Sequence, residues 1–279
     1  MANVTTAARS AAVLGATGAV GREVVQSLLL TRNDWDPIVL LNRRPSLASF
    51  PSDPRLVEQI IPMSANDLQE GGPLEKECSQ IFRTHATSVL FITMGVGAPS
   101  KVLEDELRRV DVDIPTSVAR GAAATTSVAH VSILTAVGAD IAAIPATSDG
   151  LFGMMPRTRA GGGLYNFCKG KVEENIQAMS ETWHTSTFRP ATLIGTPNTP
   201  GYVATIAGWF DGLVPALYKK SDISTLGAAM VLDAEKRLEV NTENTEASRF
   251  SIFQGEELHM LYKEVLEAGE ELKQGGGEL

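Results

Sequence analysis

Ala11-Ala12-Val13-Leu14-Gly15-Ala16-Thr17-Gly18-Ala19-Val20-Gly21 is the most informative stretch of this sequence. Its first four residues predict a short buried strand, and helical character runs from Gly18 to Leu30. Glycines at such a junction let the backbone turn tightly and approach a pyrophosphate, which the free N–H groups of the helix N-terminus would bind. The spacing G-x-x-G-x-x-G therefore indicates a nucleotide site, and a glycine turn with only a packing role is the alternative.

The chain after this stretch alternates between short apolar runs and helical segments. Strands are predicted at Ile38–Leu41, Leu56–Ile61, Ser88–Thr93, His130–Thr135 and Thr185–Arg189. Helices are predicted at Lys101–Val110, Ile114–Ala124, Leu164–Ser180, Ser224–Glu239 and Glu256–Lys273. Alternation of this kind predicts an α/β fold in which helices cover parallel strands.

Residues 144–163 differ in composition from the segments around them. They are rich in Pro, Gly, Ser and Thr and end in three glycines, which predicts a long loop of the kind that often serves as a lid. We therefore expect a single domain over residues 1–279, with a core at 11–143, an inserted loop at 144–163 and a C-terminal portion at 164–279.

Composition restricts the function classes. The chain has 24 Lys and Arg against 33 Asp and Glu, which disfavours nucleic acid and anionic membranes as partners. Two cysteines and four scattered histidines form no disulfide framework and no metal-ligand pattern. No convincing targeting segment or membrane-length apolar run is present. We expect a cytoplasmic monomer or homodimer without a metal that acts on a small-molecule substrate.

A basic pair follows the second predicted strand. Asn42-Arg43-Arg44 stands where an Asp or Glu would bind the ribose 2′-hydroxyl of NAD. Arginines would instead bind a 2′-phosphate. The pair therefore favours NADP over NAD, and a solvated basic pair is the alternative. Small residues in Thr93-Met94-Gly95 end another strand and suit close approach of a ligand, although a simple strand-to-loop turn explains them equally.

Tyr165 and Lys169 have the spacing Y-x-x-x-K, which puts both on one face of a helix. A lysine ammonium beside a phenol lowers the pKa of the phenol, which suits it to general acid or base catalysis at a carbonyl. The lysine would also hold the nicotinamide ribose. A third partner is expected near the end of the fifth strand, where Thr135 is the nearest hydroxyl to bind a substrate oxygen. An ordinary packed threonine is the alternative.

Together with Leu134–Asp140 and Phe188-Arg189-Pro190, these motifs resemble the short-chain dehydrogenase/reductases. The T-G-x-x-G turn is similar to the extended and atypical branch, and most similar to the Tat-interacting-protein-like oxidoreductases. The resemblance covers about Val13 to Arg237. It implies a Rossmann-type doubly wound parallel sheet that binds NADP along its strand ends, with a small C-terminal substrate-binding portion.

The resemblance also assigns residues. The pyrophosphate would lie on Gly15, Thr17, Gly18, Ala19, Val20 and Gly21; the 2′-phosphate on Arg43 and Arg44; and the riboses and nicotinamide beside Thr93, Met94, Gly95, Lys169 and Pro190. Tyr165 and Lys169 match the catalytic pair. Two features depart from the family. Thr135-Ala136 stands where a pair of serines is usual, and the segment from Thr135 to Tyr165 is longer than in the nearest relatives of the family.

These observations favour an enzyme, an NADP-dependent oxidoreductase that transfers hydride to or from a carbonyl or alcohol of a small, mostly apolar molecule. Apolar residues in Leu151–Met155 and Val203–Leu217 are candidates to line its pocket. Two alternatives stay open: a non-redox isomerase or cyclase that uses Tyr165, and a regulatory protein that holds NADP without turnover.

Overall fold

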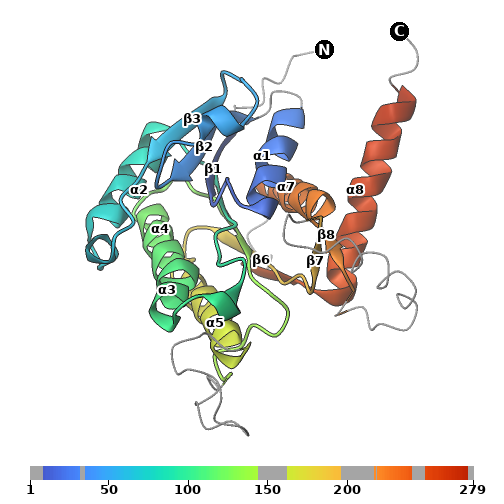
Figure 1. Ribbon diagram of the computed structural model, residues 1–279. Helices are drawn as coiled ribbons and strands as arrows, with labels where there is room; N and C mark the ends of the chain where they lie inside the picture. Colours follow the sequence, from blue (N-terminus) through green and yellow to red (C-terminus); the bar gives the residue numbers. More distant parts are fainter. Residues whose placement is uncertain are drawn as a thin grey trace, which may run out of the picture.

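The computed structural model describes residues 9–31, 35–143, 162–195, 217, 219–240 and 249–275. Its centre is a parallel sheet of seven strands in the order β3-β2-β1-β4-β5-β6-β9 (Figure 1). The strands are β1 (Arg9–Leu14), β2 (Trp35–Asn42), β3 (Leu56–Ile60), β4 (Val89–Ile92), β5 (His130–Leu134), β6 (His184–Phe188) and β9 (Phe250–Phe253). A separate parallel pair joins β7 (Leu193–Ile194) to β8 (Ser221–Asp222). The predicted α/β, Rossmann-like architecture is confirmed.

Helices cover both faces of the sheet (Figure 1). On one face lie α1 (Ala19–Leu30), α7 (Ile223–Val240) and α8 (Gly255–Gly275), and on the other α2 (Pro73–Thr84), α4 (Ile114–Ala123) and α5 (Gly162–Ala178). Alternating residues of each strand supply the two cores: Ala11 and Val13 of β1 pack toward α1, while Ala12 and Leu14 pack toward α2 and α4. The central strands, such as β4, are therefore buried on both faces, as is typical of parallel sheets.

The six predicted strands are confirmed, and several other elements differ from the predictions. Helix α2 and strand β9 were not predicted. The helix expected at Lys101–Val110 is instead a 3₁₀ turn η3 (Pro99–Lys101), a short α3 (Glu104–Arg108) and a π-helical segment η4 (Arg109–Asp113) that leads into α4. Helix α5 begins at Gly162, two residues before the predicted start at Leu164. No helix among the described residues is long and apolar enough to cross a membrane.

Candidate active site

The glycine turn lies directly against the carboxyl end of β4. Gly15 has φ of +89°, and a Cβ at this position would lie 2.6 Å from the backbone nitrogen of Met94. A Cβ on Gly21 would lie 2.1 Å from the carbonyl oxygen of Gly15. The Thr93 hydroxyl donates to the carbonyl of Leu14 at 3.0 Å, which ties the two strand ends together. At both positions the neighbouring backbone lies too close for a Cβ atom, so only glycine fits.

Helix α1 begins at this turn with an open N-terminus. Gly18 is its N-cap and provides no side-chain hydrogen bond, and the first turn carries no acidic residue. Thr17 and Gly18 are exposed, Ala19 is half-buried, and Val20 is buried in the core. The first amides of the helix thus lack a capping side chain, and their positive dipole end is suited to an anion.

Arg43 and Arg44 are exposed just past β2. Neither forms an ion pair within the part of the chain that the structure describes. Their turn is held by Glu58 of β3, which accepts hydrogen bonds from the Ser46 backbone at 2.7 Å and the Asn42 amide at 2.9 Å. Burial raises the pKa of Glu58, but these hydrogen bonds outweigh it and hold the pKa below its ordinary value. The Glu58 carboxylate thus stabilises the backbone of this turn.

A third arginine lies at the glycine turn and was missed from the sequence. Arg22 donates to the carbonyl of Thr17 at 3.2 Å and to that of Ser49 at 3.3 Å, and its guanidinium lies 5.4 Å from the Phe50 ring centroid. Its position directly after the last glycine of the motif was the available signal. The turn therefore has a fixed cation beside it.

Tyr165 and Lys169 share one face of α5, as predicted. The Lys169 ammonium lies 5.6 Å from the centroid of the Tyr165 ring. Burial raises the pKa of Tyr165, the Lys169 charge lowers it less, and the pKa stays above its ordinary value. The Lys169 charge therefore shifts the Tyr165 pKa in the expected direction, but it does not lower that pKa below its ordinary value.

The direct partner of Lys169 is Asp111, which sequence reasoning missed. Their Nζ and Oδ1 atoms lie 2.6 Å apart, and the side chains are 6% and 0% exposed. Burial lowers the pKa of Lys169, but Asp111 and Tyr165 outweigh it, so the pKa is raised. A Cβ on Gly95 would lie 3.0 Å from the Lys169 nitrogen. The ammonium therefore lies at the carboxyl end of β4, close to the glycine turn.

Thr135 lies in a different network from the one expected. Its hydroxyl donates to Glu173 of α5 at 2.6 Å, and the residue is buried. Glu173 also forms a two-point ion pair with Arg189, at the end of β6. Since a hydroxyl has one hydrogen to donate, this geometry argues against Thr135 as the donor to a substrate oxygen. Pro190 comes directly after Arg189, and its carbonyl accepts a 3.0 Å hydrogen bond from the backbone N–H of Val137.

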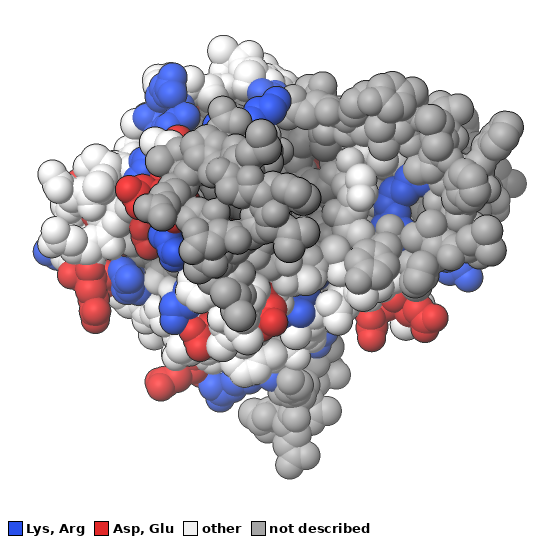
Figure 2. All heavy atoms as spheres, turned by 60° about the horizontal axis from the view of Figure 1, so that its bottom comes forward, with Lys and Arg blue, Asp and Glu red and all other residues white. Residues whose placement is uncertain are grey.

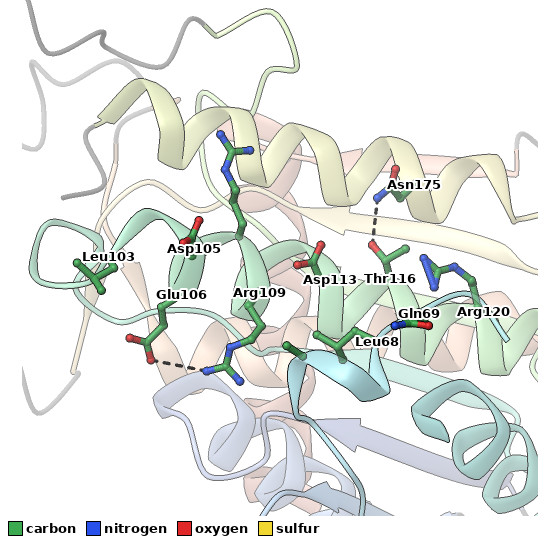
Figure 3. Close-up of a pocket in the computed structure, with 12 residues that line it drawn as sticks. Leu68, Gln69, Leu103, Asp105, Glu106, Arg109, Asp113, Thr116, Arg120 and Asn175 are labelled. Carbon is green, nitrogen blue, oxygen red and sulfur yellow. Dashed lines mark hydrogen bonds and ion pairs between the residues drawn. The ribbon is translucent and has the colours of Figure 1, made fainter. Parts of the chain in front are cut away.

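A cavity of about 710 Å³ lies between α5, the α3–η4–α4 segment and the loop before α2 (Figure 3). Asn175 reaches Thr116 on one side of it, at 3.1 Å, and Glu106 pairs with Arg109 on another. Its charged lining residues are Asp105, Glu106, Arg108, Arg109, Asp113 and Arg120. None of the predicted site residues lines this cavity, and its charges of opposite sign favour no particular ligand.

Charge on the neighbouring surface is also mixed. Figure 2 shows basic and acidic side chains interspersed over the face that is lowest in Figure 1. The predicted lining segments Leu151–Met155 and Val203–Leu217 lie outside the described residues, apart from Leu217. Among the residues that are described, no group of three or more His, Cys, Asp or Glu side chains is placed to hold a metal.

Comparison with known proteins identifies the fold. No family model and no curated protein matches the chain. A short-chain dehydrogenase/reductase family oxidoreductase from Burkholderia thailandensis is similar, with a TM-score of 0.57, 14% identity and coverage of 91% of this chain and 94% of that one. The Bordetella bronchiseptica enzyme WbmG in complex with NAD is similar with a TM-score of 0.56 and 13% identity, over 96% of this chain and 80% of that one. UDP-N-acetylglucosamine 4-epimerase from Bacillus cereus is similar with a TM-score of 0.54 and 13% identity, over 88% of this chain and 79% of that one. At these identities the likeness establishes the shared Rossmann-like architecture.

Proposed function

We propose that this chain is an NADP-dependent oxidoreductase of the short-chain dehydrogenase/reductase type, acting on a carbonyl or alcohol of a small, mostly apolar molecule. The carrying observation is the glycine turn, where Gly15 closes against β4 and the α1 N-terminus lacks a capping side chain. The fold neighbours include proteins solved with NAD, which supports a dinucleotide. The narrower resemblance to the Tat-interacting-protein-like group rests on the sequence motifs alone.

The residues fit such a cofactor. A pyrophosphate would be held by the first amides of α1, in the space that a side chain at Gly15 or Gly18 would restrict. The exposed guanidinium of Arg43, with Arg44 next to it in the chain, would bind a 2′-phosphate. When bound, the dinucleotide supplies or accepts the hydride.

The chain's own catalytic contribution is proton transfer at Tyr165. With its pKa held above the ordinary value by burial, Tyr165 is a protonated phenol at neutral pH, and it would donate that proton to the oxygen of a carbonyl as the carbon is reduced. Lys169 would contact the ribose and orient the phenol. Thr135, Glu173 and Arg189 would hold the ends of β5 and β6 in place around the site.

The experiment is an absorbance assay of NADPH consumption with a panel of aldehydes and ketones. Tyr165→Phe should lower kcat about 10²- to 10⁴-fold, the usual contribution of a general acid. Tyr262→Phe, which removes a buried phenol from α8 instead, is the matched control and should keep most of the activity. Equal activity of native protein and Tyr165→Phe would refute the catalytic assignment.

An isomerase or epimerase is the second candidate. It is favoured by the engagement of the Thr135 hydroxyl with Glu173, which leaves the expected oxygen-binding donor unavailable. The same absorbance assay separates the two functions: an oxidoreductase consumes NADPH in proportion to product, whereas an isomerase shows turnover without net consumption.

A further inference from the structure

The turn that carries the two arginines is closed by a single carboxylate oxygen. Oε1 of Glu58 accepts hydrogen bonds from the Asn42 amide at 2.9 Å and from the Ser46 backbone N–H and hydroxyl at 2.7 and 2.9 Å. The Asn42 amide also donates to the Ser46 hydroxyl at 2.8 Å. Arg43 and Arg44 are exposed between these two anchored residues. The chain is therefore fixed on both sides of the arginines by a side chain of β3.

The far end of the same segment is tied to the glycine turn. After the arginines the chain forms a 3₁₀ turn at Leu47–Ser49. Arg22 of α1 donates to the carbonyl of Ser49 at 3.3 Å and to that of Thr17 at 3.2 Å. Its guanidinium lies 5.4 Å from the Phe50 ring centroid, and Phe50 packs against the core on the α1 side. One side chain thus links the arginine segment to the turn that would hold a pyrophosphate.

Strand register explains why both anchors act from the same side of the sheet. Leu40 of β2 pairs with Glu58 of β3. Leu40 and Leu56 pack in the core on the α1 side. Side chains two residues apart in a strand share a face, so Asn42 and Glu58 lie on that side as well. Helix α1, which carries Arg22, covers the same side.

We propose that Glu58 and Arg22 are positioning residues, which hold the turn of Arg43 and Arg44 in a preformed geometry beside the glycine turn and thereby set the preference for a 2′-phosphate. This inference rests on the proposed function. Ordering a mobile segment costs binding free energy, and a segment that is already fixed avoids that cost. NADH gains nothing from the fixed turn, because it has no 2′-phosphate for the arginines to bind.

The sign of one substitution separates positioning from simple charge. A carboxylate repels phosphate, so removal of the Glu58 charge alone would strengthen NADPH binding. If Glu58 positions the arginines, Glu58→Ala should instead weaken NADPH binding about 3- to 10-fold and leave NADH binding within about twofold. Calorimetric titration measures both affinities, and circular dichroism checks the fold. Glu75→Ala is the matched control, because Glu75 also accepts a backbone hydrogen bond, from Gly71 at 2.8 Å; it should leave both affinities unchanged.

Arg22→Lys makes the corresponding test at the other anchor. Lysine keeps the positive charge but lacks the planar fork that reaches the carbonyls of Thr17 and Ser49 together. The ratio of NADPH to NADH affinity should therefore fall about 3- to 10-fold. A folded variant that keeps the native ratio, or a Glu58→Ala protein that binds NADPH more tightly, would overturn the role of that residue.

A further measurement depends on neither variant nor cofactor. In the cofactor-free native protein the Ser46 amide should exchange with deuterated water about tenfold or more slowly than in an unstructured peptide, because Glu58 accepts its hydrogen bond. Exchange at the peptide rate would overturn the proposal. Native protein that binds neither dinucleotide would refute the proposed function, whereas a native preference for NADPH that survives both substitutions would overturn this inference alone.

Discussion

The hydroxyl of Thr135 donates a 2.6 Å hydrogen bond to Oε1 of Glu173, the carboxylate that also pairs with Arg189. This relationship joins the end of β5, helix α5 and the end of β6. It gives Thr135 a structural partner in place of the substrate oxygen predicted from the sequence.

Thr135→Val should therefore act mainly on stability. Losing a buried hydrogen bond to a charged group should lower the free energy of unfolding by about 1.5–3 kcal/mol, measured by urea denaturation. Thr135→Ser keeps the hydroxyl and should retain much of that stability. In the NADPH assay Thr135→Val should lose far less activity than Tyr165→Phe; an equal loss with unchanged stability would restore Thr135 as the ligand of the substrate oxygen.

Arg43 should determine the preference between the two dinucleotides. Arg43→Ala removes a charge-assisted contact to the 2′-phosphate, so NADPH affinity should fall about 10- to 100-fold, measured by calorimetric titration. NADH affinity should change little, because NADH lacks that phosphate. Arg83→Ala, on the exposed end of α2, is the control. A similar loss for both cofactors would contradict the assignment of Arg43.

Gly21 should tolerate no side chain. Gly21→Ala would put a methyl group 2.1 Å from the Gly15 carbonyl oxygen, so we expect a loss of about 3 kcal/mol or more in stability. Gly71→Ala is the matched control, because Gly71 has φ of +67° and no atom within 4 Å; it should cost only about 1–2 kcal/mol. Equal costs would show that the turn is not packed as described.

His130 should make the fold sensitive to mild acid. It is fully buried and stacked on His184 at 5.4 Å, and burial, followed by His184 and Arg237, lowers its pKa well below the ordinary value. The unfolded chain therefore binds the proton more tightly, and stability is lost as pH falls below about 6.5.

His130→Leu removes that titration. Between pH 6.5 and 5.5 the native protein should lose about 1 kcal/mol more than His130→Leu, measured by urea denaturation at each pH. His259→Leu, at a half-exposed position of α8, should follow the native protein. Parallel stability curves for native protein and His130→Leu would contradict the buried position of His130.

The sequence was most informative where a pattern is local. Buried strands such as Val89–Ile92 are continuous apolar runs, and the glycine turn contains its own strand, turn and helix. Strand β9 was missed because it is four residues long at the edge of the sheet, with the mixed sequence FSIF. Helix α2 carried an available signal, with Gly72 as N-cap, Pro73 at its start and apolar residues at helical spacing.

Two of the site contacts that were missed join residues from different segments of the chain. Asp111 reaches Lys169 because a π turn rotates it inward, and no periodicity in the sequence marks such a turn. Glu58 reaches the arginine turn from the neighbouring strand β3, which follows the turn in the chain. Pairings of this kind depend on register and three-dimensional packing.

The most direct test of the central claim is thermal melting of the purified protein with NADPH, NADP, NADH or no ligand. At 100 times its dissociation constant a ligand stabilises the native state by about 2.7 kcal/mol, which gives a clear rise in Tm. The account predicts a larger rise with NADPH and NADP than with NADH at equal concentration, and loss of that difference in Arg43→Ala. No rise with any of the three would contradict the dinucleotide site, and with it the roles assigned to Tyr165 and Lys169.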